Sequence, residues 1–225
     1  MTATVALLVP AAGAGARMGG VSKPFLELAG RAVLEWALSP FLARTDVVEV
    51  VVALGAETAA LDPGRLDPRV RTTRGGTSRF GSVANALDRL EANASLIAVH
   101  DGARPFPPPE AIDGCIRLAA AGIGAVAGIP AVDTVKRVGD REVIEGTPPR
   151  KELWYAQTPQ IFPRDLFERA IAHARTGGPA PTDDASMVER LGAEVRMVEA
   201  AATNLKITRP EDVVTAETLI ARGFV

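Results

Sequence analysis

The sequence predicts an α/β protein built on a twisted, mostly parallel β-sheet with helices on both faces. Short apolar runs alternate along the chain with longer segments of helical periodicity, which is typical of consecutive βαβ units. The chain has 225 residues of which 47% are hydrophobic, enough for one full core. The residues with unusual chemistry follow the apolar runs, at the edge where such sheets bind ligands.

The apolar runs contain mainly aliphatic and β-branched residues, and they predict buried strands over 5–9, 47–54, 96–99 and 124–129. Shorter β-segments are expected over 70–73 and 195–198. Apolar residues at helical spacing predict helices over 32–43, 78–92 and 109–121, and a further helix that begins with Pro210-Glu211-Asp212. No internal repeat or domain boundary interrupts this order.

Composition excludes several classes of protein. The formal net charge is −2 with no block of like charges, so a nucleic-acid polymer is not an expected partner. Cys115 is the single cysteine, which excludes a disulfide framework or a thiolate cluster within the chain. No apolar stretch reaches the length of a membrane span. We therefore expect a cytoplasmic protein that is not bound to a membrane.

The stretch LVPAAGAGARMGGVSKPF, residues 8–25, follows the first predicted strand. A dinucleotide-binding fingerprint would need a small residue in place of Met18, and a P-loop would need a Gly-Lys-Ser/Thr sequence. A glycine-rich loop that carries Arg17 and Lys23 remains, and its exposed N–H groups and two cations suit a polyphosphate. A tight turn with two solvated cations is the alternative.

Polar residues follow two later strands as well. The stretch 74–79, with Ser82, lies where a β-segment turns into a helix, and helix N-termini favour anions. Simple helix capping by Thr77 or Ser78 is the alternative. Asp101 could hold Mg²⁺ or a ribose hydroxyl, or it could only form an ion pair with Arg104.

Two further features lie outside this alternation. Residues 131–150 predict two polar strands around Gly139-Asp140, too hydrophilic for the core. Such a hairpin is either a solvated surface element or an arm that a second copy of the chain covers. Near the end of the chain, Lys206 lies in Asn204-Leu205-Lys206-Ile207-Thr208, and it could be a ligand-binding cation or a surface lysine.

Seven ordered motifs closely resemble the 2-C-methyl-D-erythritol 4-phosphate cytidylyltransferase family of the non-mevalonate isoprenoid pathway, over nearly the whole chain. The motifs are Pro10-Ala11-Ala12-Gly13-x-Gly15-x-Arg17-Met18 with Lys23-Pro24; Gly75-Gly76-x-x-Arg79-x-x-Ser82-Val83; His100-Asp101-x-Ala103-Arg104-Pro105; Asp133-Thr134-x-Lys136; Leu153-Trp154-x-Ala156-Gln157-Thr158-Pro159-Gln160-x-Phe162; Thr182-Asp183-Asp184-Ala185-Ser186; and Asn204-x-Lys206-x-Thr208-Arg209-Pro210-Glu211-Asp212.

The resemblance implies a Rossmann-like nucleotidyltransferase fold of the GT-A type, in one domain over residues 1–225, with 131–150 as a dimerisation arm. It implies transfer of CMP from CTP to methylerythritol phosphate with release of pyrophosphate, with Mg²⁺ as cofactor and a homodimer as the assembly. The attacking substrate phosphate is already an anion, so the reaction needs positioning and cations rather than a nucleophilic side chain.

The resemblance also implies roles for individual residues. Arg17 and Lys23 would be catalytic. The CTP-binding residues would be Ala11, Ala12, Gly13, Gly15, Gly76, Thr77, Arg79, Ser82 and Asp101. The polyol phosphate would contact Asp101, Ala103, Arg104, Thr134, Arg150 and Lys206, with Thr134 and Arg150 supplied by the neighbouring subunit's arm. Asp101 is the candidate metal ligand, with Mg²⁺ held mostly through the CTP phosphates.

The sequence departs from the family pattern at Ala16, where relatives often carry an arginine, at Phe25, and at Thr203, which replaces an acidic residue. Three other functions remain open. A cytidylyltransferase for another polyol phosphate, such as ribitol 5-phosphate, would share the CTP half of the site. A nucleotide-sugar glycosyltransferase would usually carry an Asp-x-Asp motif, which Asp101-Gly102-Ala103 lacks. A non-catalytic nucleotide-binding protein would leave Arg17 and Lys23 unexplained.

Overall fold

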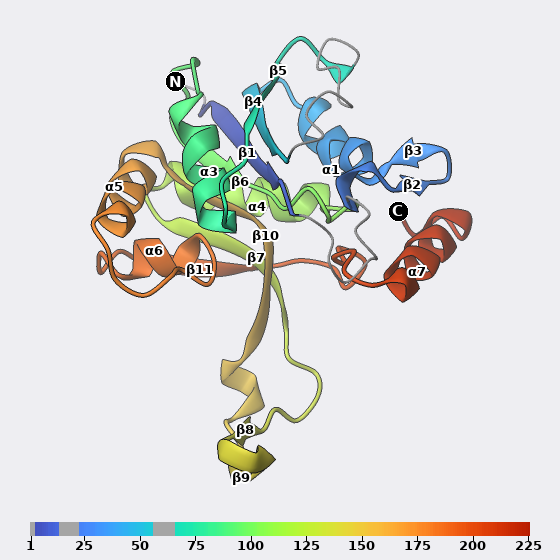
Figure 1. Cartoon of the computed structure of the whole chain (residues 1–225), viewed down its shortest axis with the longest axis vertical. Helices are drawn as coiled ribbons and strands as arrows, with labels where there is room; N and C mark the ends of the chain where they lie inside the picture. Colours follow the sequence, from blue (N-terminus) through green and yellow to red (C-terminus); the bar gives the residue numbers. More distant parts are fainter. Residues whose placement is uncertain (1–2, 14–22, 56–65) are drawn as a thin grey trace.

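The computed structural model of the chain describes residues 3–13, 23–55 and 66–225, except for the side chain of Lys23, and Figure 1 shows how its elements are arranged. The described elements, in chain order, are β1 (Val5–Ala11), η2 (Lys23–Phe25), β2 (Glu27–Leu28), β3 (Arg31–Ala32), α1 (Val33–Leu42), β4 (Val47–Leu54), β5 (Val70–Arg74), α3 (Arg79–Asp88), β6 (Leu96–Val99), α4 (Pro109–Ala120), β7 (Gly124–Pro130), β8 (Arg137–Val138), η4 (Asp140–Glu142), β9 (Ile144–Gly146), η5 (Arg150–Glu152), β10 (Trp154–Pro163), α5 (Arg164–Arg175), α6 (Ala185–Glu189), β11 (Val195–Glu199) and α7 (Pro210–Ala221).

A seven-stranded sheet in the order β11-β7-β10-β6-β1-β4-β5 forms the centre of the molecule. β1 pairs in parallel with β4 and β6, β4 pairs in parallel with β5, and β7 pairs in parallel with β11. β10 alone of these strands runs in the opposite direction, between β6 and β7. The carboxyl ends of β1, β4, β5 and β6 therefore share one edge of the sheet, which is the edge where the polar motifs emerge.

Helices cover both faces of the sheet. Successive residues of a strand point to opposite faces, so each strand contributes side chains to both cores. Val5, Leu7 and Val9 of β1 pack into the core that α1 and α4 cover. Ala6 and Leu8 pack into the core on the other face, beneath α3, α5 and α6. Burial on both faces explains why the strands are continuous apolar runs rather than alternating ones.

A third, smaller core joins α7 to the β2–β3 hairpin and the beginning of α1. It contains Leu28, Val33, Phe106, Ile207 and Ala216, all of which are buried. Phe106 follows the loop after β6, and Ile207 follows Lys206 in the chain. This core therefore anchors two loops that reach the carboxyl edge of the sheet.

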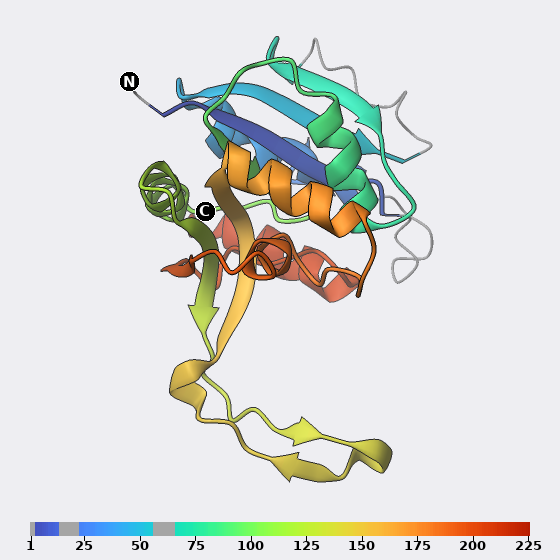
Figure 2. The ribbon, with the colours of Figure 1, turned by 90° about the vertical axis from the view of Figure 1, so that its left-hand side faces the viewer.

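A long arm projects from the end of β7 and returns through β10, and it carries the small β8–β9 hairpin at its tip (Figures 1 and 2). Its surface includes several exposed apolar side chains. Val132, Val138, Val143 and Ile144 are 73%, 54%, 57% and 60% exposed. The segment predicted as a polar hairpin thus stands clear of the sheet and presents apolar groups to its surroundings.

The structure confirms the predicted mostly parallel α/β fold and places strands or helices within every segment for which the sequence predicted them. The helix predicted over 78–92 is shorter, since α3 ends at Asp88. The antiparallel strand β10 has no counterpart among the predicted elements. Within the described residues, no helix combines the length and the apolar character needed to cross a membrane.

Candidate active site

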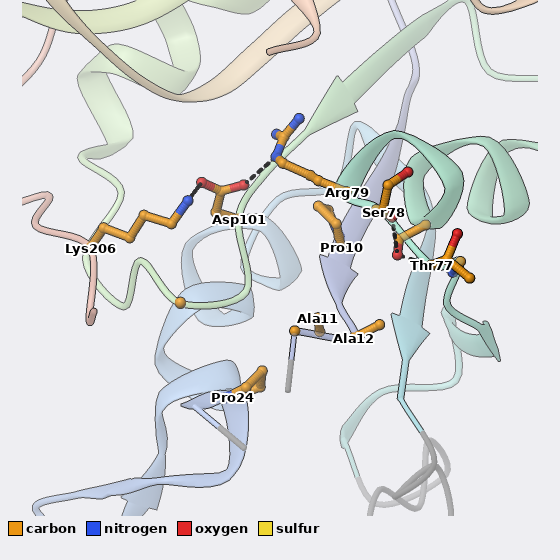
Figure 3. Close-up of a pocket in the computed structure, with 13 residues that line it drawn as sticks. Pro10, Ala11, Ala12, Pro24, Thr77, Ser78, Arg79, Asp101 and Lys206 are labelled. Atoms are coloured by element: carbon orange, nitrogen blue, oxygen red, sulfur yellow. Dashed lines mark hydrogen bonds and ion pairs between the residues drawn. The ribbon is translucent and has the colours of Figure 1, made fainter. Parts of the chain in front are cut away.

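A pocket of about 380 Å³ opens at the carboxyl edge of the sheet (Figure 3). Its walls come from the turn after β1, the N-terminal end of α3, the loop after β6 and the segment before α7. The lining residues are Pro10, Ala11, Ala12, Gly13, Pro24, Gly76, Thr77, Ser78, Arg79, Ser82, Asp101, Ala103 and Lys206. Four motifs that lie far apart in the sequence therefore meet in one cavity.

Two adjacent glycines allow the turn after β5 to lie against the turn after β1. A Cβ atom on Gly75 would clash with the Cβ of Ala12, and a Cβ on Gly76 would lie 2.6 Å from the main-chain carbon of Gly81. The Gly75 N–H donates to the carbonyl of Leu54 at 2.7 Å. This part of the pocket wall is main chain at close approach, which only glycine permits.

The N-terminal turn of α3 is held by two serines. Ser78 is the N-cap, and its hydroxyl accepts a hydrogen bond from the Gly81 N–H at 3.0 Å. The Ser82 hydroxyl donates to the Ser78 carbonyl at 3.0 Å and accepts from the Gly76 N–H at 3.1 Å. The capping alternative is therefore correct for Ser78, and it orders the same turn that lines the pocket.

Four charged side chains of alternating sign form a line across the pocket. The Asp184 carboxylate accepts from Arg79 Nη2 at 2.7 Å, and Arg79 Nε donates to Asp101 Oδ1 at 3.0 Å. Lys206 Nζ donates to the second oxygen, Asp101 Oδ2, at 2.7 Å (Figure 3). Both oxygens of Asp101 thus face a cation, and Arg79 is shared between two carboxylates.

The charges decide which of these groups ionise. Burial opposes the charge on Asp101, but Arg79 and Lys206 outweigh burial and hold the pKa of Asp101 well below its usual range. Burial raises the pKa of Asp184, and the Arg79 charge offsets only part of that effect. At neutral pH Asp101 is therefore a stable anion between two cations.

Arg104 lies behind the pocket rather than in its lining. Its Nη1 donates to the Asn204 carbonyl at 2.7 Å, and its Nε lies 3.8 Å from Asp101 Oδ2. The shorter contacts of Asp101 with Arg79 and Lys206 mean that the local Asp101–Arg104 pair is the weakest of the three. Arg104 links the loop after β6 to the loop before Lys206.

The structure brings most of the predicted site residues together. Those that line the pocket are Ala11, Ala12, Gly13, Gly76, Thr77, Arg79, Ser82, Asp101, Ala103 and Lys206. Gly15, Ala16 and Arg17 lie outside the described residues. The main chain of Lys23 begins η2 beside the pocket-lining Pro24, while its side chain lies outside the description.

Thr134 and Arg150 belong to the arm, and neither is among the pocket-lining residues of its own chain. Arg150 Nη1 instead donates to the Val132 carbonyl at 2.6 Å. Sequence reasoning assigned no role to Asp184, the buried partner of Arg79. The signal was present in the Thr182-Asp183-Asp184-Ala185-Ser186 motif, but nothing local in the sequence connects that motif to Arg79.

No cluster of three or more potential metal-ligating side chains exists among the residues that the structure describes. Asp101 is the one carboxylate in the described pocket lining, and cations occupy both of its oxygens. The protein side chains described here therefore do not fit a Mg²⁺ site of their own.

A turn of small residues after the first strand, a capped helix N-terminus and a carboxylate between two cations meet at the carboxyl edge of the mostly parallel sheet. This combination of fold and pocket is typical of nucleotide-binding α/β transferases. A family model described as 2-C-methyl-D-erythritol 4-phosphate cytidylyltransferase matches residues 5–222. The chain therefore belongs to this family, and it is a nucleotidyltransferase.

Individual relatives agree with the family match. The 2-C-methyl-D-erythritol 4-phosphate cytidylyltransferase of Symbiobacterium thermophilum is 39% identical over 218 residues, covering 96% of this chain and 92% of the relative. The protein of the same name from Aeromonas hydrophila is 42% identical over 208 residues, with 91% and 85% covered. The crystal structure of the Thermus thermophilus enzyme has a TM-score of 0.80 at 36% identity, covering 98% of this chain and 100% of that one.

Proposed function

We propose that this chain transfers CMP from CTP to 2-C-methyl-D-erythritol 4-phosphate. An oxygen of the substrate phosphate attacks the α-phosphorus of CTP in line, the bond from that phosphorus to the bridging oxygen breaks, and pyrophosphate leaves. The observation that carries the proposal is Asp101 held between Arg79 and Lys206 in a pocket lined by the family's nucleotide-binding motifs.

The charged groups at the described pocket hold cations for two anionic substrates. Arg79 and Lys206 are balanced by Asp101 and Asp184, so the excess positive charge for two phosphates would come from Arg17 and Lys23. The substrate phosphate is an anion at neutral pH and needs no side chain to remove a proton. Catalysis then consists of positioning the two phosphates and stabilising charge at the α-phosphorus.

The proposed roles divide along the pocket. The turn 10–13 and the wall 76–82 would enclose the cytidine, because main chain at close approach limits the size of the base. Arg17 and Lys23 would bind the CTP phosphates and stabilise the transition state. Lys206 would bind the phosphate of the second substrate, and this contact would take the place of part of its pairing with Asp101.

Mg²⁺ would enter with the CTP phosphates, because the described side chains offer no separate cage for it. When bound there it would neutralise phosphate charge. Dependence of CTP affinity on added Mg²⁺ tests this assignment. We also propose a cytoplasmic location, since the reaction consumes CTP, and cell fractionation tests it.

The arm would complete the site of a second copy of the chain. Its exposed valine and isoleucine side chains offer apolar area that a partner can cover, while Thr134 and Arg150 would reach the partner's polyol phosphate. Arg150→Ala and Lys206→Ala would each be inactive alone. Mixed and allowed to exchange subunits, they would regain about a quarter of wild-type activity, because half the dimers carry one intact site. No recovery after verified exchange would contradict shared sites.

Pyrophosphate release with CTP and Mg²⁺ tests the proposed reaction. We expect rapid release with 2-C-methyl-D-erythritol 4-phosphate and little with ribitol 5-phosphate at the same concentration. Preference for ribitol 5-phosphate would keep the chemistry and refute the substrate. No release with either phosphate, from protein that binds CTP, would refute the transferase assignment.

A further inference from the structure

His100 immediately precedes Asp101, and the proposed reaction gives it no role. Its side chain is completely buried at the end of β6. The ring packs against Phe41 with centroids 5.2 Å apart. A residue needed only to fill this space could be wholly apolar, so the polar ring requires a further explanation.

Three hydrogen bonds connect this ring to the pocket loop. Thr158 Oγ1, on β10, accepts from the Asp101 N–H at 3.0 Å and pairs with His100 Nδ1 at 3.0 Å. His100 Nε2 pairs with the Arg104 carbonyl at 3.0 Å. The ring therefore ties β10 to both ends of the turn from Asp101 to Arg104, which is itself closed by the Arg104 N–H to Asp101 carbonyl bond at 3.0 Å.

The partners determine which ring nitrogen carries the proton. A carbonyl oxygen only accepts, so Nε2 must be protonated to bond the Arg104 carbonyl. The Thr158 hydroxyl accepts from the Asp101 N–H and has one proton of its own, which it donates to Nδ1, so Nδ1 carries no proton. In this relay, which runs from the Asp101 N–H through the Thr158 hydroxyl and the His100 ring to the Arg104 carbonyl, each polar atom therefore has one consistent role as donor or acceptor.

We propose that His100 is a positioning residue whose Nε2–H tautomer, through Thr158 and the Arg104 carbonyl, fixes the loop that aims the Asp101 carboxylate between Arg79 and Lys206. This inference rests on the proposed function and deepens it. Asp101 contacts its two cations at 3.0 and 2.7 Å, so a displacement of about 1 Å would break both contacts. Misplacement of that size costs about 10²-fold in rate.

Two variants separate positioning from space filling. His100→Phe keeps the ring volume and loses both hydrogen bonds, and we expect kcat/KM to fall about 10²-fold. His100→Asn fills the space less well but keeps an acceptor near the Nδ1 position for the Thr158 hydroxyl. We expect it to be more active than His100→Phe although it packs less well. Space filling alone predicts the opposite order, which would overturn the proposal.

The double variant His100→Phe with Thr158→Val removes two facing polar groups together. The Asp101 N–H and the Arg104 carbonyl both lose their partners in this variant, so Tm should stay low. Because both residues act on the same loop, the loss in kcat/KM should be no larger than that of the more damaging single variant. Losses in kcat/KM that add fully would show two independent effects and overturn the proposal.

A ¹⁵N NMR measurement tests the tautomer without any turnover. The chain has two histidines, and the exposed His173 can be removed as His173→Gln, which should leave activity unchanged. The remaining ring should show a protonated Nε2 and a bare Nδ1 at neutral pH, and Thr158→Val should move the Nδ1 signal. A protonated Nδ1 would overturn the proposal for His100 even if the transferase reaction is established. A protonated Nε2 with a bare Nδ1 would support the proposal even if the substrate assignment failed.

Discussion

Arg79→Met tests the charge line at the base of the pocket. Arg79 lies 3.0 Å from Asp101 and 2.7 Å from Asp184, whose side chains are only 10% and 1% exposed. At these separations and an effective dielectric constant of about 20, each pair gains about 6 kcal/mol of gross attraction. Desolvation offsets much of this attraction, but methionine would leave the buried Asp184 without its cation and Asp101 with Lys206 alone. We therefore expect the free energy of unfolding to fall by about 3–5 kcal/mol.

Thermal unfolding at fixed protein concentration measures this loss. For a chain of this length the expected fall in Tm is about 6–20 °C. Arg175→Met is the matched control, since Arg175 pairs with Asp88 at 2.6 Å but both side chains are about half exposed. An exposed pair contributes at most about 1 kcal/mol, so the control should change Tm little.

The pH dependence has a defined sign. Burial already raises the pKa of Asp184 in the folded state, and loss of Arg79 would raise it further. A carboxyl whose pKa is raised in the folded state stabilises the fold at low pH, and this stability is lost as pH rises. The difference in Tm between Arg79→Met and wild type should therefore narrow as pH falls toward about 4. Adding Asp184→Asn to Arg79→Met should recover part of the loss at neutral pH. A fall in Tm no larger than that of Arg175→Met, or a gap that is independent of pH, would refute this reasoning.

Three further predictions concern other parts of the chain. Gly76→Ala would place a methyl group 2.6 Å from the main chain of Gly81, and steady-state kinetics should show KM for CTP raised about tenfold. Arg69→Met would leave three main-chain carbonyls between residues 42 and 47 without their donor, and urea unfolding should show a loss of about 1–3 kcal/mol. Lys206→Gln should raise KM for the polyol phosphate more than KM for CTP; it also removes a charge that lowers the Asp101 pKa, so the acid limb of the kcat/KM profile should move to higher pH.

The central sheet could be predicted because each parallel strand is buried on both faces. Runs such as β4 contain almost only aliphatic side chains, and in the helices between the strands the apolar residues recur at helical spacing. β10 could not be recognised in this way. It includes Gln157, Thr158 and Gln160, which are 6%, 3% and 2% exposed, so polar side chains interrupt the apolar pattern of a strand that is nevertheless buried.

Pocket residues could be predicted only as separate motifs, because the pattern of a single chain does not show which motifs meet. Asp184 contacts Arg79 from 105 positions away, and Lys206 contacts Asp101 from the same separation. The sign of each charge was readable, and a carboxylate beyond a buried strand already indicated a ligand edge. The pairing depends on how α6 and the segment before α7 pack on the sheet, which is a property of the tertiary fold.

The polar residues that hide β10 from pattern recognition are the same ones that hold the pocket loops. Asn204 donates to Gln157 Oε1 at 2.8 Å and to the Thr158 carbonyl at 2.9 Å, so β10 anchors the segment that carries Lys206. Thr158 anchors the loop that carries Asp101. An apolar β10 would fill the core equally well but would not make these hydrogen bonds to the two loops. The departure of β10 from an apolar strand pattern therefore has a physical reason. Its buried polar side chains hold the two loops that position Asp101 and Lys206.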